Sequence, residues 1–107
     1  SQLTITQLHY LHRIEACNGI TGTELSKEFN VAKPTITNAI SRLVEHGYVR
    51  KQTSSRDKRV SFLFLTKEGQ RVLAVERQGY YDYAKKVLEN LSEEEAEQLC
   101  KLFGKLF

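Results

Sequence analysis

The hydrophobic pattern of this chain changes from helical to strand-like and back again, and this change constrains the fold more than any other feature. Up to Gly47 the apolar residues recur at the spacing that buries one face of a helix. Residues 48–53 and 60–65 are instead rich in residues that favour β structure, and helical spacing returns from residue 67. The pattern predicts three helices, a β-hairpin and two further helices.

Capping boxes and a proline indicate where these helices begin. In a capping box, a Ser or Thr at the N-cap and a Glu or Gln three residues later satisfy each other's backbone N–H groups. Pro34 suits a first helical turn, where its N–H is not needed. We expect helices over residues 5–17, 21–29, 33–46 and 67–90, and a last helix from residue 92; the boxes are Thr4 with Gln7, Thr21 with Glu24, and Ser92 with Glu95.

The bulk composition indicates one soluble domain. The chain has 107 residues, of which 40% are hydrophobic, so there is room for one core. No stretch reaches the roughly 18 uncharged apolar residues of a membrane span, and the start lacks the regions of a signal peptide. We therefore expect a cytoplasmic protein without a membrane partner. Cys17 and Cys100 stand far apart without CxxC spacing, so we expect two buried free thiols and no zinc finger.

The charges are unevenly distributed along the chain. Residues 33–59 carry a net charge of +5, whereas residues 89–107 carry −3. A basic middle and an acidic end suggest one surface that faces a polyanion and another that is kept away from it. A solvated charged face produces the same bias, so charge alone does not decide for nucleic acid.

The second and third predicted helices, joined by a tight turn at residues 30–32, have the order of a helix-turn-helix. Such a pair places its second helix in the major groove of DNA. Asn can pair with adenine through two hydrogen bonds, and Arg can pair with guanine or hold a phosphate. An ordinary solvent-exposed face is the alternative, above all for Thr and Ser. The candidate DNA-binding residues of this helix are Lys33, Thr35, Thr37, Asn38, Ser41 and Arg42.

The tip of the predicted hairpin is basic. Three cations and one anion follow Ser54 and Ser55 on an exposed turn, where they cannot stabilise a core. Arg side chains fit the minor groove, whose negative potential grows as the groove narrows. A loop that only improves solubility is the alternative. The candidate DNA-binding residues of this turn are Arg56, Asp57, Lys58 and Arg59.

Four motifs, in this order and at this spacing, resemble the MarR family of winged helix-turn-helix transcriptional regulators. They are the opening LTITQ (residues 3–7), LVEHGYVR (43–50), DKR (57–59) and LTKEG (65–69). The resemblance implies a mainly α fold with a two-stranded β-hairpin wing (α+β), in which residues 1–66 bind DNA and residues 67–107 form a helical dimerisation segment. It further implies a homodimer that binds a pseudo-palindromic double-stranded DNA operator as a repressor or an activator. By family position, Arg59 is the minor-groove arginine, and Asp57 orients Arg59 or a nearby basic group.

The sequence departs from the family pattern in two places. The family usually has a Ser or Thr two residues before the Pro34 position, as the cap of the recognition helix, but this chain has Ala32. The family also carries a further N-terminal helix in its dimerisation domain, to which no residues here correspond. We therefore expect the dimer to depend on the last two helices, unless the chain is a fragment.

Members of the family often respond to small molecules or metals. His9 and His12 could present two imidazoles to a metal, but Leu8 stands where a zinc-sensing subgroup has a carboxylate, and the long helix contains no histidine. We therefore expect no metal or cofactor, and a small-molecule effector of unknown identity is left open. Tyrosines in the long helix could line an aromatic pocket, although packing in a dimer explains them better. They are Tyr80, Tyr81 and Tyr83.

Two other classes of function compete with DNA binding. A winged helix that binds another protein would be expected to expose aromatic anchors, whereas the candidate surface is basic and polar. An enzyme would need a phosphate-binding glycine loop or a nucleophile with its base, and the sequence contains neither. We therefore expect a protein that is not an enzyme.

Overall fold

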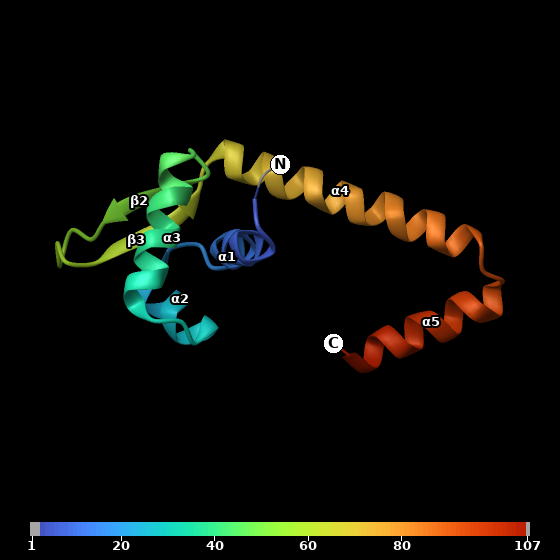
Figure 1. Ribbon diagram of the computed structural model, residues 1–107. Coiled ribbons are helices and arrows are strands. Elements are labelled where there is room, and N and C mark those ends of the chain that lie inside the picture. Colours follow the sequence, from blue (N-terminus) through green and yellow to red (C-terminus); the bar gives the residue numbers. More distant parts are fainter. Residues whose placement is uncertain (1–2, 107) are drawn as a thin grey trace. The chain divides into compact units, whose positions relative to one another are not determined.

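The computed structural model describes residues 3–106, apart from the side chains of Phe103 and Leu106. Within that range it contains the predicted order of three helices, a hairpin and two helices (Figure 1). The elements are α1 (Ile5–Ala16), β1 (Ile20–Thr21), α2 (Gly22–Phe29), α3 (Lys33–Glu45), β2 (Val49–Thr53), β3 (Ser61–Leu65), α4 (Lys67–Glu89) and α5 (Glu93–Leu106).

The predicted capping boxes form at the starts of α1, α2 and α5. In α1, Gln7 N donates to Thr4 Oγ1 at 3.1 Å, and Thr4 N donates to Gln7 Oε1 at 2.9 Å. The same reciprocal bonds join Thr21 with Glu24 and Ser92 with Glu95. Local side-chain chemistry therefore determines where these helices begin.

The start of α3 has no side-chain cap. Ala32 occupies the N-cap with extended backbone angles (φ −58°, ψ 142°), and it offers no oxygen to the orphan N–H groups of the first turn. We expect Ala32→Ser to raise the free energy of unfolding by about 1 kcal/mol, because Ser can accept one of those N–H groups. Urea denaturation measures the change. Ala16→Ser is the control: it adds the same hydroxyl at the exposed C-terminal end of α1, where no orphan N–H groups need an acceptor, and should not stabilise the protein.

The sheet has three strands in the order β1-β3-β2, so the prediction of a two-stranded hairpin was incomplete. β1 pairs antiparallel with β3, with Ile20 opposite Leu63 and Thr21 opposite Phe62. A strand of two residues is too short to show a periodic pattern. It forms because Gly19 turns the chain after α1 with a φ of 104°, a conformation that L residues with a side chain rarely adopt.

One hydrophobic core holds α1, α2, α3, the sheet and the start of α4 together. Val44 is an apolar residue of α3, but it is 36% exposed and lies outside this core. It is at the edge of the apolar face, one position past the fully buried Leu43. The core residues are Tyr10, Leu11, Ile14, Ile20, Leu25, Ile36, Ile40, Leu43, Val49, Leu63 and Leu73.

The chain divides into two compact units, Ser1–Ala74 and Val75–Phe107. The first turns of α4 belong to the first unit, since Gly69 and Leu73 are buried there. The division into a DNA-binding part (1–66) and a dimerisation part (67–107) concerns function and stays a prediction.

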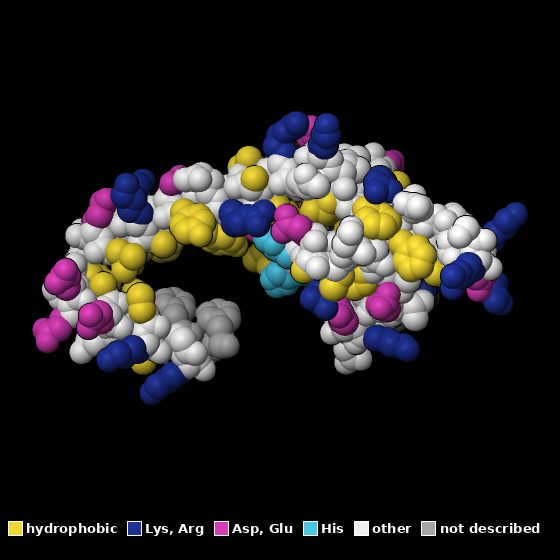
Figure 2. Space-filling view, turned by 180° about the vertical axis from the view of Figure 1, so that it is seen from behind, with side chains coloured by type: hydrophobic (Ala, Val, Ile, Leu, Met, Phe, Trp, Pro, Cys, Tyr) yellow, Lys and Arg dark blue, Asp and Glu magenta, His cyan; other side chains and the backbone are white. Residues whose placement is uncertain are grey.

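The second unit consists of the rest of α4 and of α5. Figure 2 shows hydrophobic side chains gathered along both helices. The tyrosines of α4 are 65–71% exposed, so the chain by itself does not bury them. Among the described residues, no helix has the length and apolar character that a membrane crossing needs.

Candidate nucleic-acid interface

Helix α3 buries one face and exposes the predicted polar one. Ile36, Ile40 and Leu43 are at most 4% exposed. All six candidate residues of this helix, from Lys33 to Arg42, are exposed. The amphipathic spacing therefore predicted correctly which face of α3 is buried. The short polar side chains of the other face are available to a ligand.

Side chains fix the turn between α2 and α3. Ser26 Oγ donates to Val31 O at 2.5 Å, and Val31 N donates to Ser26 O at 3.0 Å. Asn30 ends α2 in the left-handed conformation (φ 52°), which Asn tolerates better than most residues. Lys33 Nζ donates to Thr23 Oγ1 at 2.8 Å, so this candidate DNA contact also joins the two helices.

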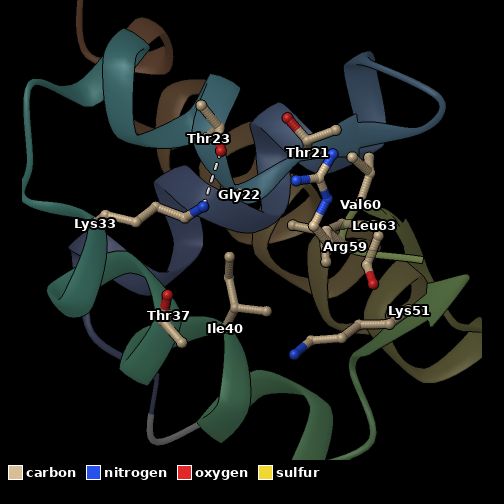
Figure 3. A pocket seen from close by; sticks show the side chains of 11 residues that line it. Thr21, Gly22, Thr23, Lys33, Thr37, Ile40, Lys51, Arg59, Val60 and Leu63 are labelled. Carbon is tan, nitrogen blue, oxygen red and sulfur yellow. Dashed lines mark hydrogen bonds between the residues drawn. The ribbon is translucent and has the colours of Figure 1, made fainter. Parts of the chain in front are cut away.

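A pocket of about 440 Å³ lies between α3 and the sheet (Figure 3). Three cations line it, Lys33 from α3, Lys51 from β2 and Arg59 from the wing, and in the figure their side chains surround Ile40. Among the described residues no carboxylate lines the pocket itself, and Asp57 holds Arg59 from outside it. The other lining residues are Thr21, Gly22, Thr23, Thr37, Val60, Ser61 and Leu63. The pocket therefore suits an anion.

Lys51 is a candidate that the sequence reasoning missed. Successive residues of a strand point to opposite faces. On β2 this alternation separates Lys51, which lines the pocket beside α3, from Arg50, which lies 4.4 Å over the ring of Phe64. The cations of residues 33–59 therefore do not all lie on one surface. The two-residue period of a strand was the sequence signal that could have separated Arg50 from Lys51.

The wing tip is held by hydrogen bonds within the turn. Ser54 Oγ accepts from the N–H groups of Arg56 and Asp57 at 3.1 and 3.2 Å. Arg56 and Lys58 are exposed at this tip, and cationic side chains project at the right-hand edge of Figure 2, where the wing lies. These two residues do not line the pocket beside α3.

Asp57 and Arg59 pair through three hydrogen bonds, two of them between their side chains. Arg59 Nε and Nη2 each donate to the Asp57 carboxylate at 3.1 Å, and Arg59 N donates to the same group at 3.0 Å. The Arg59 side chain is nevertheless 90% exposed. Asp57 therefore orients Arg59 without removing it from solvent, which is the geometry expected for these two residues.

The Asp57–Arg59 pair gives a prediction about pH. The hydrogen bonds from the Arg59 side chain and backbone hold the pKa of Asp57 below its ordinary value of 3.8. A lowered folded-state pKa stabilises the wing at pH above that value, and this contribution is lost as the pH falls through the folded pKa. We expect NMR titration of the Asp57 carboxyl to give a midpoint below 3.8, and Arg59→Ala to raise that midpoint. An unchanged midpoint in Arg59→Ala would contradict the pairing.

The histidines and cysteines differ in their exposure. His9 is exposed and His12 is half-buried, and no group of three potential metal ligands is found among the described residues. Cys17 is half-buried but Cys100 is exposed, so the expectation of two buried thiols was wrong. Cys100 lies on α5, within the unit that has little core of its own.

Residues 3–61 match the family model described as "MarR family". The chain belongs to the MarR family. Among the relatives of this MarR-family chain, the HTH-type transcriptional repressor YetL of Bacillus subtilis (strain 168) is 38% identical over 85 residues, which cover 79% of this chain and 51% of YetL. The HTH-type transcriptional regulator BilQ of Clostridium symbiosum (strain WAL-14163) is 25% identical over 104 residues, 97% of this chain and 72% of BilQ.

The fold agrees with that of a solved relative. The crystal structure of Streptococcus pneumoniae FabT in complex with DNA superposes with a TM-score of 0.80 at 28% identity, covering 98% of this chain and 73% of FabT. This MarR-family chain is thus a winged helix-turn-helix protein. It spans about half the length of YetL.

Proposed function

We propose that this MarR-family chain binds double-stranded DNA in a sequence-specific manner and acts as a transcriptional repressor. The observation that carries the proposal is the surface made by α3 and the wing, where exposed polar side chains lie next to a pocket that three cations and no carboxylate of the described residues line. Helix α3 would enter a major groove, and the wing, with Arg59, the adjacent minor groove. The names of YetL and BilQ and the DNA bound to FabT support this assignment.

The protein would act as a homodimer on a pseudo-palindromic site. Exposed hydrophobic side chains on α4 and α5 are the surface that a second copy would cover, since monomers rarely leave so many large apolar side chains exposed together. They are Val75, Tyr80, Tyr81, Tyr83, Leu88 and Leu102. Analytical ultracentrifugation measures whether this dimer forms. A small-molecule effector would act on the dimer.

Binding to random duplex DNA across a salt series tests the proposal. A protein that neutralises phosphates releases counterions, so the logarithm of the affinity should fall steeply and linearly with the logarithm of the salt concentration. No dependence on salt, or no binding at all, would instead favour the alternative that the winged helix binds another protein.

Asn38 is expected to read a base. Its amide is exposed on α3, where it can make two hydrogen bonds to an adenine. On the site selected from random DNA, Asn38→Ala should cost about 1–3 kcal/mol of binding free energy. Fluorescence anisotropy on the selected and on random duplexes measures the difference. Equal losses on both would make Asn38 a backbone contact.

A further inference from the structure

Exposed residues of α3 border a pocket on each flank of the helix. Lys33 and Thr37 border the pocket beside the wing. Thr35, Asn38 and Arg42 border a second pocket, of about 350 Å³, on the side where α1 begins. The α1 residues in this second pocket are Thr4, Thr6, Gln7 and Tyr10, and Ala39 completes its lining. Helix α3 therefore has a pocket along each side, and each pocket contains at least one cation.

The second pocket suits an anion through Arg42. Within the described part of the chain, no carboxylate lines the pocket and Arg42 makes no ion pair. The capping box of α1 already occupies Thr4 Oγ1 and Gln7 Oε1. Across the pocket from α3, Thr6 is exposed and its hydroxyl takes no part in the cap, so it can donate to a ligand.

The dimensions of DNA decide which part of it would meet Arg42. The major groove is about 12 Å wide, close to the diameter of a helix with its side chains. Residues at the centre of the inserted face then meet base edges, while residues on the flanks meet the phosphates that border the groove. Arg42 lies on the flank towards α1, about 40° further round the helix than Asn38, and the wing lies on the other flank. Asn38 lies nearer the centre of the exposed face, opposite the buried Ile36 and Leu43, so it can still meet a base edge.

The geometry points to a phosphate site formed by Arg42 and Thr6. This inference, which rests on the proposed DNA binding, assigns Arg42 to the DNA backbone and not to a guanine. The guanidinium donates two hydrogen bonds to one phosphate, and the Thr6 hydroxyl donates a third. The first turn of α1 thereby becomes part of the interface, and α3 is held in the groove from both sides.

Substitutions distinguish a phosphate contact from base reading. Arg42→Gln should lower the affinity about tenfold on random and on selected duplexes alike, and lower the magnitude of the salt slope by about 0.9 per protomer. Thr6→Val should weaken both duplexes a few-fold with the slope unchanged, because it removes a hydrogen bond and no charge. Lys85→Gln, an equal loss of charge on the exposed surface of α4, is the control and should change neither quantity.

Replacing single phosphates of the duplex by neutral groups identifies the phosphate that Arg42 contacts. When single methylphosphonates are placed along the selected duplex, one position per half-site should weaken the wild-type protein but not Arg42→Gln. A loss confined to the selected duplex, with a changed base preference, would show that Arg42 reads a base and would overturn the inference. Unchanged affinity of Arg42→Gln for both duplexes would also overturn the inference. If the wild-type protein binds neither duplex, the proposed function itself fails.

Discussion

Gly69→Ala is expected to lower the free energy of unfolding by about 3 kcal/mol, an unusually large effect for the addition of one methyl group. Gly69 is buried in the first turns of α4, where a Cβ would lie far inside the contact distance of Tyr48 O. The obstacle is a backbone carbonyl, so no side-chain rotation can relieve the clash. Helix α4 would have to move away from the end of α3.

That movement would break hydrogen bonds at the same junction. Thr66 N donates to Tyr48 O at 3.1 Å, and Thr66 Oγ1 donates to Gly47 O while it accepts from Gly69 N. Gly79→Ala is the matched control on the same helix, because Gly79 is exposed and nothing lies within 4 Å of an added Cβ. It should stabilise the protein by about 0.5–1 kcal/mol through helix propensity. Urea denaturation measures both variants, and equal changes would contradict the close approach at Tyr48.

The helices were predictable because their signals are local. Each capping box acts within four residues, and the apolar spacing of α3 is a property of one segment. The missed strand β1 depends instead on pairing with β3, more than 40 residues later, and only the folded chain brings Ile20 opposite Leu63. A two-residue segment has no pattern of its own that could reveal such a partner.

The candidate site was predictable in its residue types and less so in its grouping. The sequence assigned Thr35, Asn38 and Arg42 to one contacting face, but did not reveal that they border the start of α1. It also counted Arg50 and Lys51 as parts of one basic region, although the strand places them on opposite faces. The type of each residue can be read directly from the sequence. Which residues lie next to one another depends on contacts between elements that are distant in the sequence.

The combined variant Lys33→Gln, Lys51→Gln, Arg59→Gln is expected to have the largest effect on DNA binding. These three cations come from α3, β2 and the wing and line one pocket without a carboxylate. If each one displaces a counterion, Lys33 and Lys51 at phosphates and Arg59 in the minor groove, their loss lowers the magnitude of the salt slope by about 2.7 per protomer. The affinity at physiological salt should fall on the order of a hundredfold.

The fold should tolerate this triple change, since all three residues are exposed and exposed charges contribute little to stability. Lys85→Gln, Lys86→Gln, Lys101→Gln removes the same charge from exposed positions of α4 and α5. Anisotropy titrations of both triple variants at several salt concentrations separate a local effect from a general one. Because the net charge changes equally in both, a smaller salt slope in the first variant alone would assign binding to the pocket between α3 and the sheet. Equal losses in both would mean that DNA responds to the overall charge of the protein and not to this surface.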